Sequence, residues 1–218
     1  KAPEEKIGNV EKLLAEVALA ISEQRGRSVK VRFQHPPIML EVPHPNPQPI
    51  RWPRVSPNGP HEALAGRGYE WGRAVDQIVK LDKSPHTLIA GITGSGKSVL
   101  AQGMALSLAR KTSPAECRFM LIDLKREDLV PLAKLPHTVE FAGDPDHAMR
   151  VIESVAEESA RRRDSHGKPN HRIVLWIDEL AQLPVDGLQM LNSILALGRS
   201  QQINVVSATQ HPTAEIMG

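Results

Sequence analysis

Residues 91–98 (GITGSGKS) constrain the fold of this 218-residue chain most strongly, because this glycine-rich octapeptide separates two apolar segments of different period. Before it, residues 87–90 form a short apolar run after Pro85, which predicts a buried strand. After it, residues 99–110 place apolar side chains at helical spacing and predict an amphipathic helix. We therefore expect a strand, a tight turn and a helix, in that order.

The same octapeptide has the spacing of a phosphate-binding loop, with four residues between two glycines and Lys-Ser after the second. Gly94 and Gly96 would let the backbone approach a phosphate and turn N–H groups toward it, at a helix start with partial positive charge. Lys97 could reach the β- and γ-phosphates of ATP, and the Ser98 hydroxyl could bind Mg²⁺. A turn that binds nothing would leave Lys97 without a role. The predicted nucleotide-binding residues are Thr93, Gly94, Ser95, Gly96, Lys97, Ser98 and Val99.

Composition excludes several classes of protein. Lysine plus arginine number 27 and aspartate plus glutamate 25, so the net charge is only +2 and any surface that attracts nucleic acid must be local. Cys117 is the single cysteine, which excludes an intrachain disulfide and favours a cytoplasmic setting. There is neither a signal peptide nor an apolar run of the ~20 residues that span a bilayer. Because the chain begins with Lys1, we expect a fragment, and any membrane anchor would lie outside it.

The first 42 residues predict a small α/β subdomain. Residues 4–24 have helical periodicity, and the segments 29–33 and 38–42 have the character of strands. We interpret this subdomain as a packing or linker module.

Seven prolines between residues 43 and 60 exclude helix and central strand, so residues 43–66 predict a semi-rigid connector. A ligand for another protein's proline-binding groove is the alternative. Residues 67–82 fit a short strand or a helix leading into the core. We assign the core to residues 67–218 and expect it to be incomplete at its C-terminal end.

Strands and helices alternate through this core. Strands are predicted at 118–123, 173–177 and 203–209, with helices from Asp144-Pro145 to about 163 and from Asp186 to about 198–200. This alternation predicts a mainly parallel sheet flanked by helices with right-handed crossovers. The three arginines at 161–163 either favour the negative end of their helix or contact DNA or a neighbouring subunit.

Two adjacent carboxylates, Asp178 and Glu179, follow the apolar strand 173–177. Sites in parallel sheets form at the carboxyl ends of the strands. Asp178 would hold Mg²⁺ directly or through water, and Glu179 would polarise the attacking water. The alternative is a solvated strand end, but a phosphate-binding loop some 80 residues earlier favours the catalytic interpretation.

Taken in order, these motifs resemble the motor domain of the FtsK/SpoIIIE family of DNA translocases. The stretches that carry the resemblance are 41–47 (EVPHPNP), 85–91 (PHTLIAG), 93–98 (TGSGKS), 121–125 (LIDLK), 136–137 (PH), 177–181 (IDELA), 198–200 (GRS) and 208–212 (ATQHP). The resemblance extends over most of the chain. The family usually has proline at the position of Leu124 and arginine at that of His211, and its motor continues beyond the point at which this chain ends.

The resemblance implies a RecA-like P-loop NTPase core and a ring, usually hexameric, with ATP at the subunit boundaries. Gln210 would sense the γ-phosphate, and Arg199 would act on the ATP of the adjacent subunit unless it only makes a surface contact. Lys125 and Arg126 would face the ring lumen unless they are solvated loop charges.

The implied substrate is double-stranded DNA, which a translocase grips by its backbone without reading bases. Aromatic residues make up only 3% of the chain, which disfavours stacking on single strands. The rival functions are a type VII protein-secretion ATPase, a conjugative coupling protein and a degenerate nucleotide-dependent scaffold. The presence of Lys97, Asp178 and Glu179 argues against the scaffold.

Overall fold

The computed structural model describes residues 3–25, 32–34, 39–41, 52, 59–70, 73–165 and 169–210. It divides into two compact units, Lys1–Arg51 and Trp52–Gly218. The division lies inside the predicted connector 43–66, most of which is outside the described residues. A bilayer crossing would need a longer and more apolar helix than any that the structure describes.

The first unit contains one helix and one strand pair. Helix α1 (Pro3–Arg25) is followed by the antiparallel strands β1 (Arg32–Gln34) and β2 (Met39–Glu41). This helix–strand–strand order is the predicted one. The remaining residues of the two predicted strands, 29–31, 38 and 42, lie outside the described residues.

The second unit is built on a five-stranded, wholly parallel sheet with the order β5-β9-β8-β6-β7. Its strands are β5 (His86–Ala90), β6 (Cys117–Ile122), β7 (Thr138–Ala142), β8 (Arg172–Ile177) and β9 (Ile203–Thr209). Its helices are α2 (Lys97–Ala109), α3 (Pro145–Asp164) and α4 (Val185–Gln201), with short 3₁₀ turns η1 (Val130–Lys134) and η2 (Leu180–Gln182). The predicted α/β class and parallel sheet are confirmed.

Helices cover both faces of the sheet, and β8 shows how the sequence specifies this. Every residue of β8 is buried. Val174 and Trp176 belong to the core cluster beneath α2, whereas Leu175 and Ile177 belong to the cluster beneath α3 and α4. A strand that is apolar on both faces has no polar alternation, which is why residues 173–177 are a continuous apolar run.

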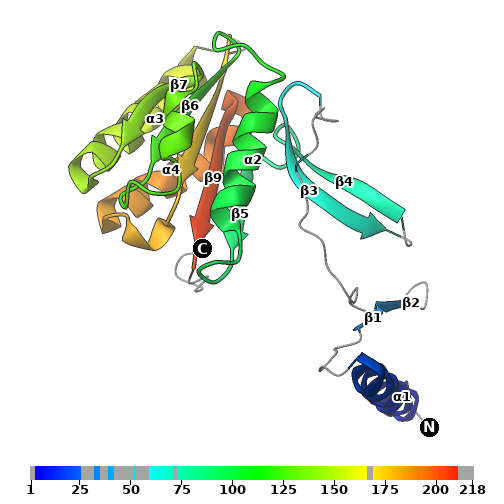
Figure 1. Cartoon of the computed structure of the whole chain (residues 1–218). Helices are drawn as coiled ribbons and strands as arrows, with labels where there is room; N and C mark the ends of the chain where they lie inside the picture. Colours follow the sequence, from blue (N-terminus) through cyan, green and yellow to red (C-terminus); the bar gives the residue numbers. More distant parts are fainter. Residues whose placement is uncertain are drawn as a thin grey trace. The chain divides into compact units, whose positions relative to one another are not determined.

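An antiparallel hairpin precedes the sheet and settles the open assignment of residues 67–82. Strands β3 (Glu62–Glu70) and β4 (Arg73–Lys80) pair along their length and run beside α2 (Figure 1). The Leu64 N–H donates to Ser107 Oγ of α2 at 2.8 Å, and the side chains of Ala63 and Leu64 are buried. Residues 62–66 are therefore strand, and the predicted connector extends too far.

The helix boundaries follow local chemistry. Asp144 caps α3, since its carboxylate accepts from the His147 N–H at 2.9 Å and Pro145 occupies the first turn, as predicted. Helix α4 begins one residue before Asp186 and continues past Gly198 to Gln201, one residue beyond the predicted end at about 198–200. A side chain at Gly198 would collide with the Ile203 carbonyl and the His86 ring, so glycine lets α4 close against the sheet.

Candidate nucleotide-binding site

The glycine-rich loop joins β5 to α2 and has the conformation that its sequence predicts. Gly94 and Gly96 have positive φ angles of 74° and 93°, which side chains rarely tolerate, and a Cβ at either would meet nothing within 4 Å. Gly91 is needed for a different reason, because a Cβ there would lie 2.7 Å from Ser95 Oγ. The loop is thus tightly turned, exposed and open on its outer side.

Positive groups converge on this loop. Lys97 Nζ donates to the carbonyl of Ile92, within its own loop, at 3.1 Å. In the described helix α2, no side chain caps the N-terminus and no acid stands in the first turn. The N–H groups of that turn and the Lys97 ammonium are therefore available to a phosphate.

The sheet order brings the predicted acids to the same end of the sheet as the glycine-rich loop, where the strands have their carboxyl ends. We call this end the carboxyl edge. Gln210 follows β9, which lies between β5 and β8, and Asp178 and Glu179 follow β8. The register pairs Ala90 with Thr209, so the loop after β5 and Gln210 leave neighbouring strands at the same level. Because adjacent strands are about 4.8 Å apart, the ends of β5 and β8 are separated by roughly 10 Å, about the reach of a nucleotide's phosphates.

A chain of hydrogen bonds crosses this edge from the loop to Glu179. Thr93 Oγ1 donates to Gln210 Oε1 at 2.8 Å, and the Gln210 N–H lies 3.2 and 3.3 Å from the two carboxylate oxygens of Glu179. The Gly91 N–H also donates to the Thr209 carbonyl at 3.2 Å. Glu179 is 9% exposed, so its carboxylate is held by its backbone partner at a nearly dry position.

Asp178 lies in a negative environment. The pKa of its carboxyl group is raised to about 6, first by burial and then by the nearby carboxylates Asp128 and Asp123, whereas Lys125 acts in the opposite direction. Such surroundings favour a cation beside the Asp178 carboxylate.

Among the described residues, no group of three or more His, Cys, Asp or Glu side chains could enclose a metal ion. Mg²⁺ rarely needs such a cage, because one or two protein oxygens, phosphates and waters complete its octahedron. Ser98 at the start of α2 and Asp178 after β8 therefore suit a Mg²⁺–nucleotide pair.

Three predicted cationic residues have different outcomes. The structure describes the position of Arg199 on α4 but not its side chain. Arg126 has a positive φ of 56°, and its Nε donates to the Gly143 carbonyl at 3.0 Å. Lys125 is exposed and acts electrostatically on Asp178.

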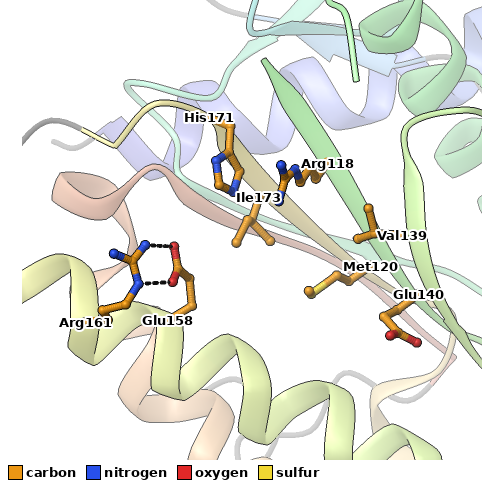
Figure 2. A pocket seen from close by; sticks show the side chains of 8 residues that line it. All are labelled: Arg118, Met120, Val139, Glu140, Glu158, Arg161, His171 and Ile173. Atoms are coloured by element: carbon orange, nitrogen blue, oxygen red, sulfur yellow. Dashed lines mark hydrogen bonds and ion pairs between the residues drawn. The ribbon is translucent and has the colours of Figure 1, made fainter. Parts of the chain in front are cut away.

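A hollow lies at the other end of the sheet. It has a volume of about 410 Å³ and lies toward the amino ends of β6 and β8, beside the last turns of α3. Figure 2 shows its apolar floor of Met120, Val139 and Ile173, with the paired side chains of Glu158 and Arg161 at one side. None of the predicted site residues lines it.

The sequence analysis did not identify Asp123 and Gln102 as site residues. It placed Asp123 at the end of the predicted strand 118–123 and Gln102 within the predicted helix 99–110. An acid at the end of a third parallel strand was the available signal. Their contacts depend on the folding of the loop after β6.

Fold and loop together define a P-loop NTPase core of the RecA-like type. A model of the FtsK/SpoIIIE family matches residues 49–170, more than half of the chain. The chain therefore belongs to the FtsK/SpoIIIE family.

Curated relatives support this assignment. The DNA translocase FtsK of Sporosarcina ureae is 31% identical over 193 residues, covering 73% of this chain and 24% of the relative. The DNA translocase SftA of Bacillus subtilis is 33% identical over 165 residues, covering 64% and 17%. The chain thus spans about a quarter or less of the length of these two relatives.

Solved structures share the fold at lower identity. EssC (ATPases 2 and 3) from Geobacillus thermodenitrificans superposes with a TM-score of 0.67 and 20% identity, covering 79% of this chain and 38% of that one. The pCW3 conjugation coupling protein TcpA, in its monomer form with ATPγS, gives 0.66 and 18%, covering 97% and 66%.

Proposed function

We propose that this chain is the ATP-hydrolysing core of a cytoplasmic ring motor that moves double-stranded DNA. Relatives above 30% identity are DNA translocases, and the chain belongs to their family. The observation that carries the ATPase part is the meeting of the glycine-rich loop, Gln210 and Glu179 at one edge through continuous hydrogen bonds.

The residues at this edge divide the work of phosphoryl transfer to water, which is mostly positioning and charge stabilisation. Lys97 and the loop N–H groups bind the phosphates, with Thr93, Gly94, Ser95, Gly96 and Val99 forming the cradle. Ser98 and Asp178 hold Mg²⁺, which when bound neutralises phosphate charge. Glu179 orients the attacking water.

Gln210 joins the two halves of the site. Its side chain contacts Thr93 in the loop, while its backbone N–H contacts the Glu179 carboxylate. A phosphate that displaces Thr93 would release the Gln210 side chain. Gln210 therefore reports the presence of the γ-phosphate to the residue that orients water.

The ring supplies the remaining cation. In this proposal Arg199 of one subunit acts on the ATP of its neighbour in a hexamer, an effect worth roughly 10³-fold or more. Mixing Arg199→Ala subunits with Lys97→Ala subunits tests it, because some boundaries then regain both residues. Recovery of hydrolysis supports action across the boundary, and no recovery at any ratio contradicts it.

The test of the proposed function is the rate of ATP hydrolysis by the complete protein with and without duplex DNA. We expect DNA to stimulate hydrolysis, and the stimulation to weaken steeply with salt because contacts are to phosphates. Hydrolysis that DNA leaves unchanged would favour a protein-secretion ATPase. The fold likeness to EssC motivates this second candidate.

Stimulation by DNA, combined with a dependence on a membrane anchor, would favour the third candidate, a conjugative coupling protein. The fold likeness to TcpA motivates it.

A further inference from the structure

The loop between β6 and η1 is folded around one buried carboxylate. Asp123 is 0% exposed, and its Oδ2 accepts from the N–H groups of Glu127 at 3.0 Å and Leu129 at 2.9 Å. The Arg126 N–H donates to the Asp123 carbonyl at 3.0 Å, where Arg126 adopts a left-handed φ. Residues 123–129 thus form a closed turn whose shape depends on Asp123.

The same loop is tied to the helix that follows the glycine-rich loop. Asp128 lies between the two residues whose N–H groups Asp123 accepts, and its carbonyl accepts from Gln102 Nε2 at 2.5 Å. Gln102 is in α2, five residues after Lys97. Asp123 and Gln102 therefore hold one short segment from both sides, and that segment connects the end of β6 to the phosphate-binding helix.

Asp123 and Asp178 are neighbours across the sheet. Strand register pairs Ile122 with Ile177, and the Asp178 N–H donates to the Ile122 carbonyl at 3.0 Å. Leu129, which Asp123 holds through its N–H, lines a small void together with Ala101 and Asp178. The loop, the helix and the acid of the candidate Mg²⁺ site thus surround one point.

One oxygen of Asp123 remains unused. Among the described residues, Asp123 Oδ1 is buried and has no hydrogen-bond partner, which is costly for a carboxylate. Its other oxygen, Oδ2, is already engaged by the two loop N–H groups. The carboxylate therefore acts through the loop that it folds and through a donor that Oδ1 can still accept.

We infer that Asp123 is a positioning residue of the nucleotide site, which fixes loop 123–129 against Asp178 and, through Gln102, against the helix that carries Lys97 and Ser98. This inference rests on the proposed function. Loop 123–129 then determines both the charge around Asp178 and the position of the start of α2.

Two variants of Asp123 separate folding of the loop from charge. Asp123→Asn retains an acceptor for the two N–H groups and removes the negative charge, whereas Asp123→Ala removes both. Gln102→Met keeps the side-chain length and removes only the link to Asp128. Thr138→Val is the matched control, because Thr138 Oγ1 likewise holds a nearby backbone carbonyl, that of Leu132, at 2.7 Å but belongs to β7.

The readout is calorimetric affinity of the full chain for ATP, with Mg²⁺ and with Mg²⁺ chelated. Partners one shell away from a metal change metal affinity by about 10- to 100-fold. We expect Asp123→Ala to weaken MgATP binding by that amount and metal-free ATP binding by less than about threefold. Asp123→Asn and Gln102→Met should weaken MgATP binding by about three- to tenfold, and Thr138→Val by less than twofold.

Hydrogen exchange supplies a readout that needs no nucleotide. The N–H groups of Glu127 and Leu129 should lose protection in Asp123→Ala and keep it in Asp123→Asn. Protection that is unchanged in Asp123→Ala would overturn the inference.

Two further outcomes would also overturn it. The first is MgATP affinity in Asp123→Ala within twofold of wild type. The second is an equal loss with and without Mg²⁺, which would indicate a general packing role. If Asp123→Ala does not fold, Asp123→Asn and Gln102→Met decide by the same criteria. If wild type and Lys97→Ala both fail to bind ATP, the proposed function fails as well, and that result is distinguishable from a defect confined to Asp123.

Discussion

The two ends of the parallel sheet treat charged side chains in opposite ways. At the amino end, Arg162 is buried, and its guanidinium donates to Glu158 at 2.6 Å and to the Gln201 carbonyl at 2.7 Å. At the carboxyl end, Lys97 contacts only a carbonyl of its own loop, and the Asp178 carboxylate has no hydrogen-bond partner within the described part of the chain. Arg162 at the amino end is engaged in holding elements together, whereas Lys97 and Asp178 at the carboxyl end remain available.

A second arginine strengthens this contrast. Arg172, buried at the start of β8, bonds to Asn204 and pairs with Asp82. Asn204 in turn donates to the carbonyls of Leu81 at 3.0 Å and Pro85 at 2.7 Å. The amino end therefore joins β8, β9 and the segment before β5. The buried ion pairs that stabilise the fold and the proposed catalytic residues therefore lie at opposite ends of one sheet. Mutations at one end should change the free energy of unfolding, and mutations at the other should change ATP binding and hydrolysis.

The largest expected effect is on hydrolysis, at the carboxyl end. Glu179→Gln keeps an acceptor for the Gln210 N–H but loses the charge that orients water, so kcat should fall by about 10²- to 10⁴-fold with ATP affinity retained. Single-turnover hydrolysis and nucleotide binding measure the two quantities. Turnover within threefold of wild type would contradict the role of Glu179.

Lys97→Ala should weaken ATP binding and hydrolysis by about 10²- to 10³-fold, because a charge-assisted phosphate contact is lost. Its melting temperature should stay at the wild-type value, since Lys97 bonds only to its own exposed loop. Lys111→Ala, an exposed lysine just after the same helix, is the control. A lower melting temperature of Lys97→Ala with unchanged ATP affinity would contradict the assignment of ATP binding to the carboxyl end of the sheet.

Arg162→Met should show the opposite pattern. It removes one of the arginine bonds to Glu158, which keeps those from Arg161, and it takes this donor away from the carbonyls of His171 and Gln201. The free energy of unfolding should fall by about 3 kcal/mol. ATP affinity of the folded fraction should remain unchanged. Urea unfolding and nucleotide binding on the same sample check this, with the exposed Arg163→Met as the matched control.

The smallest effect is a pH dependence at the amino end. Hydrogen bonds from Arg161 and Arg162 lower the pKa of Glu158 from 4.5 to about 2. The folded pKa lies below the unfolded one, so this stabilisation is present above about pH 4.5 and is lost as the pH falls toward 2. After allowance for solvent screening, it amounts to about 1 to 2 kcal/mol.

Unfolding free energies of wild type and Glu158→Gln should therefore converge as the pH falls from about 4.5 toward 2. His86, whose pKa is lowered by burial, also destabilises the fold on acidification, but it is common to both proteins. A difference that stays constant with pH would show that the pair contributes nothing electrostatic.

Sequence patterns predicted the elements whose signals are local. The glycine spacing gave the β5–α2 turn, Asp144-Pro145 gave the start of α3, and the apolar run ending in Asp178 gave β8. The hairpin was missed as a pair because Ala63, Ala65, Gly66 and Gly68 lack the β-branched alternation that marks strands. Strand β7 was missed because it has only five residues, several of them exposed at the sheet edge.

The candidate site divides in the same way. Residues within one motif were predicted together, and the sheet order brought the motifs to one edge. The roles of Arg162 and Asp123 depend on partners far along the chain, such as Gln201 for Arg162, and on the folding of a seven-residue loop for Asp123. Neither leaves a periodic signal, so a buried arginine within a charged run resembles a solvated one.

The position of strand β9 has a consequence for the proposed response of Gln210 to the γ-phosphate of ATP. Both of its edges are paired, all seven residues are buried, and Asn204 anchors its beginning. Such a strand cannot slide or tilt without breaking both neighbours, so Gln210 at its tip is a stationary reference point. In the proposed mechanism, Thr93 is then the residue that moves when the γ-phosphate binds or leaves, and the glycine-rich loop is the flexible partner of Gln210.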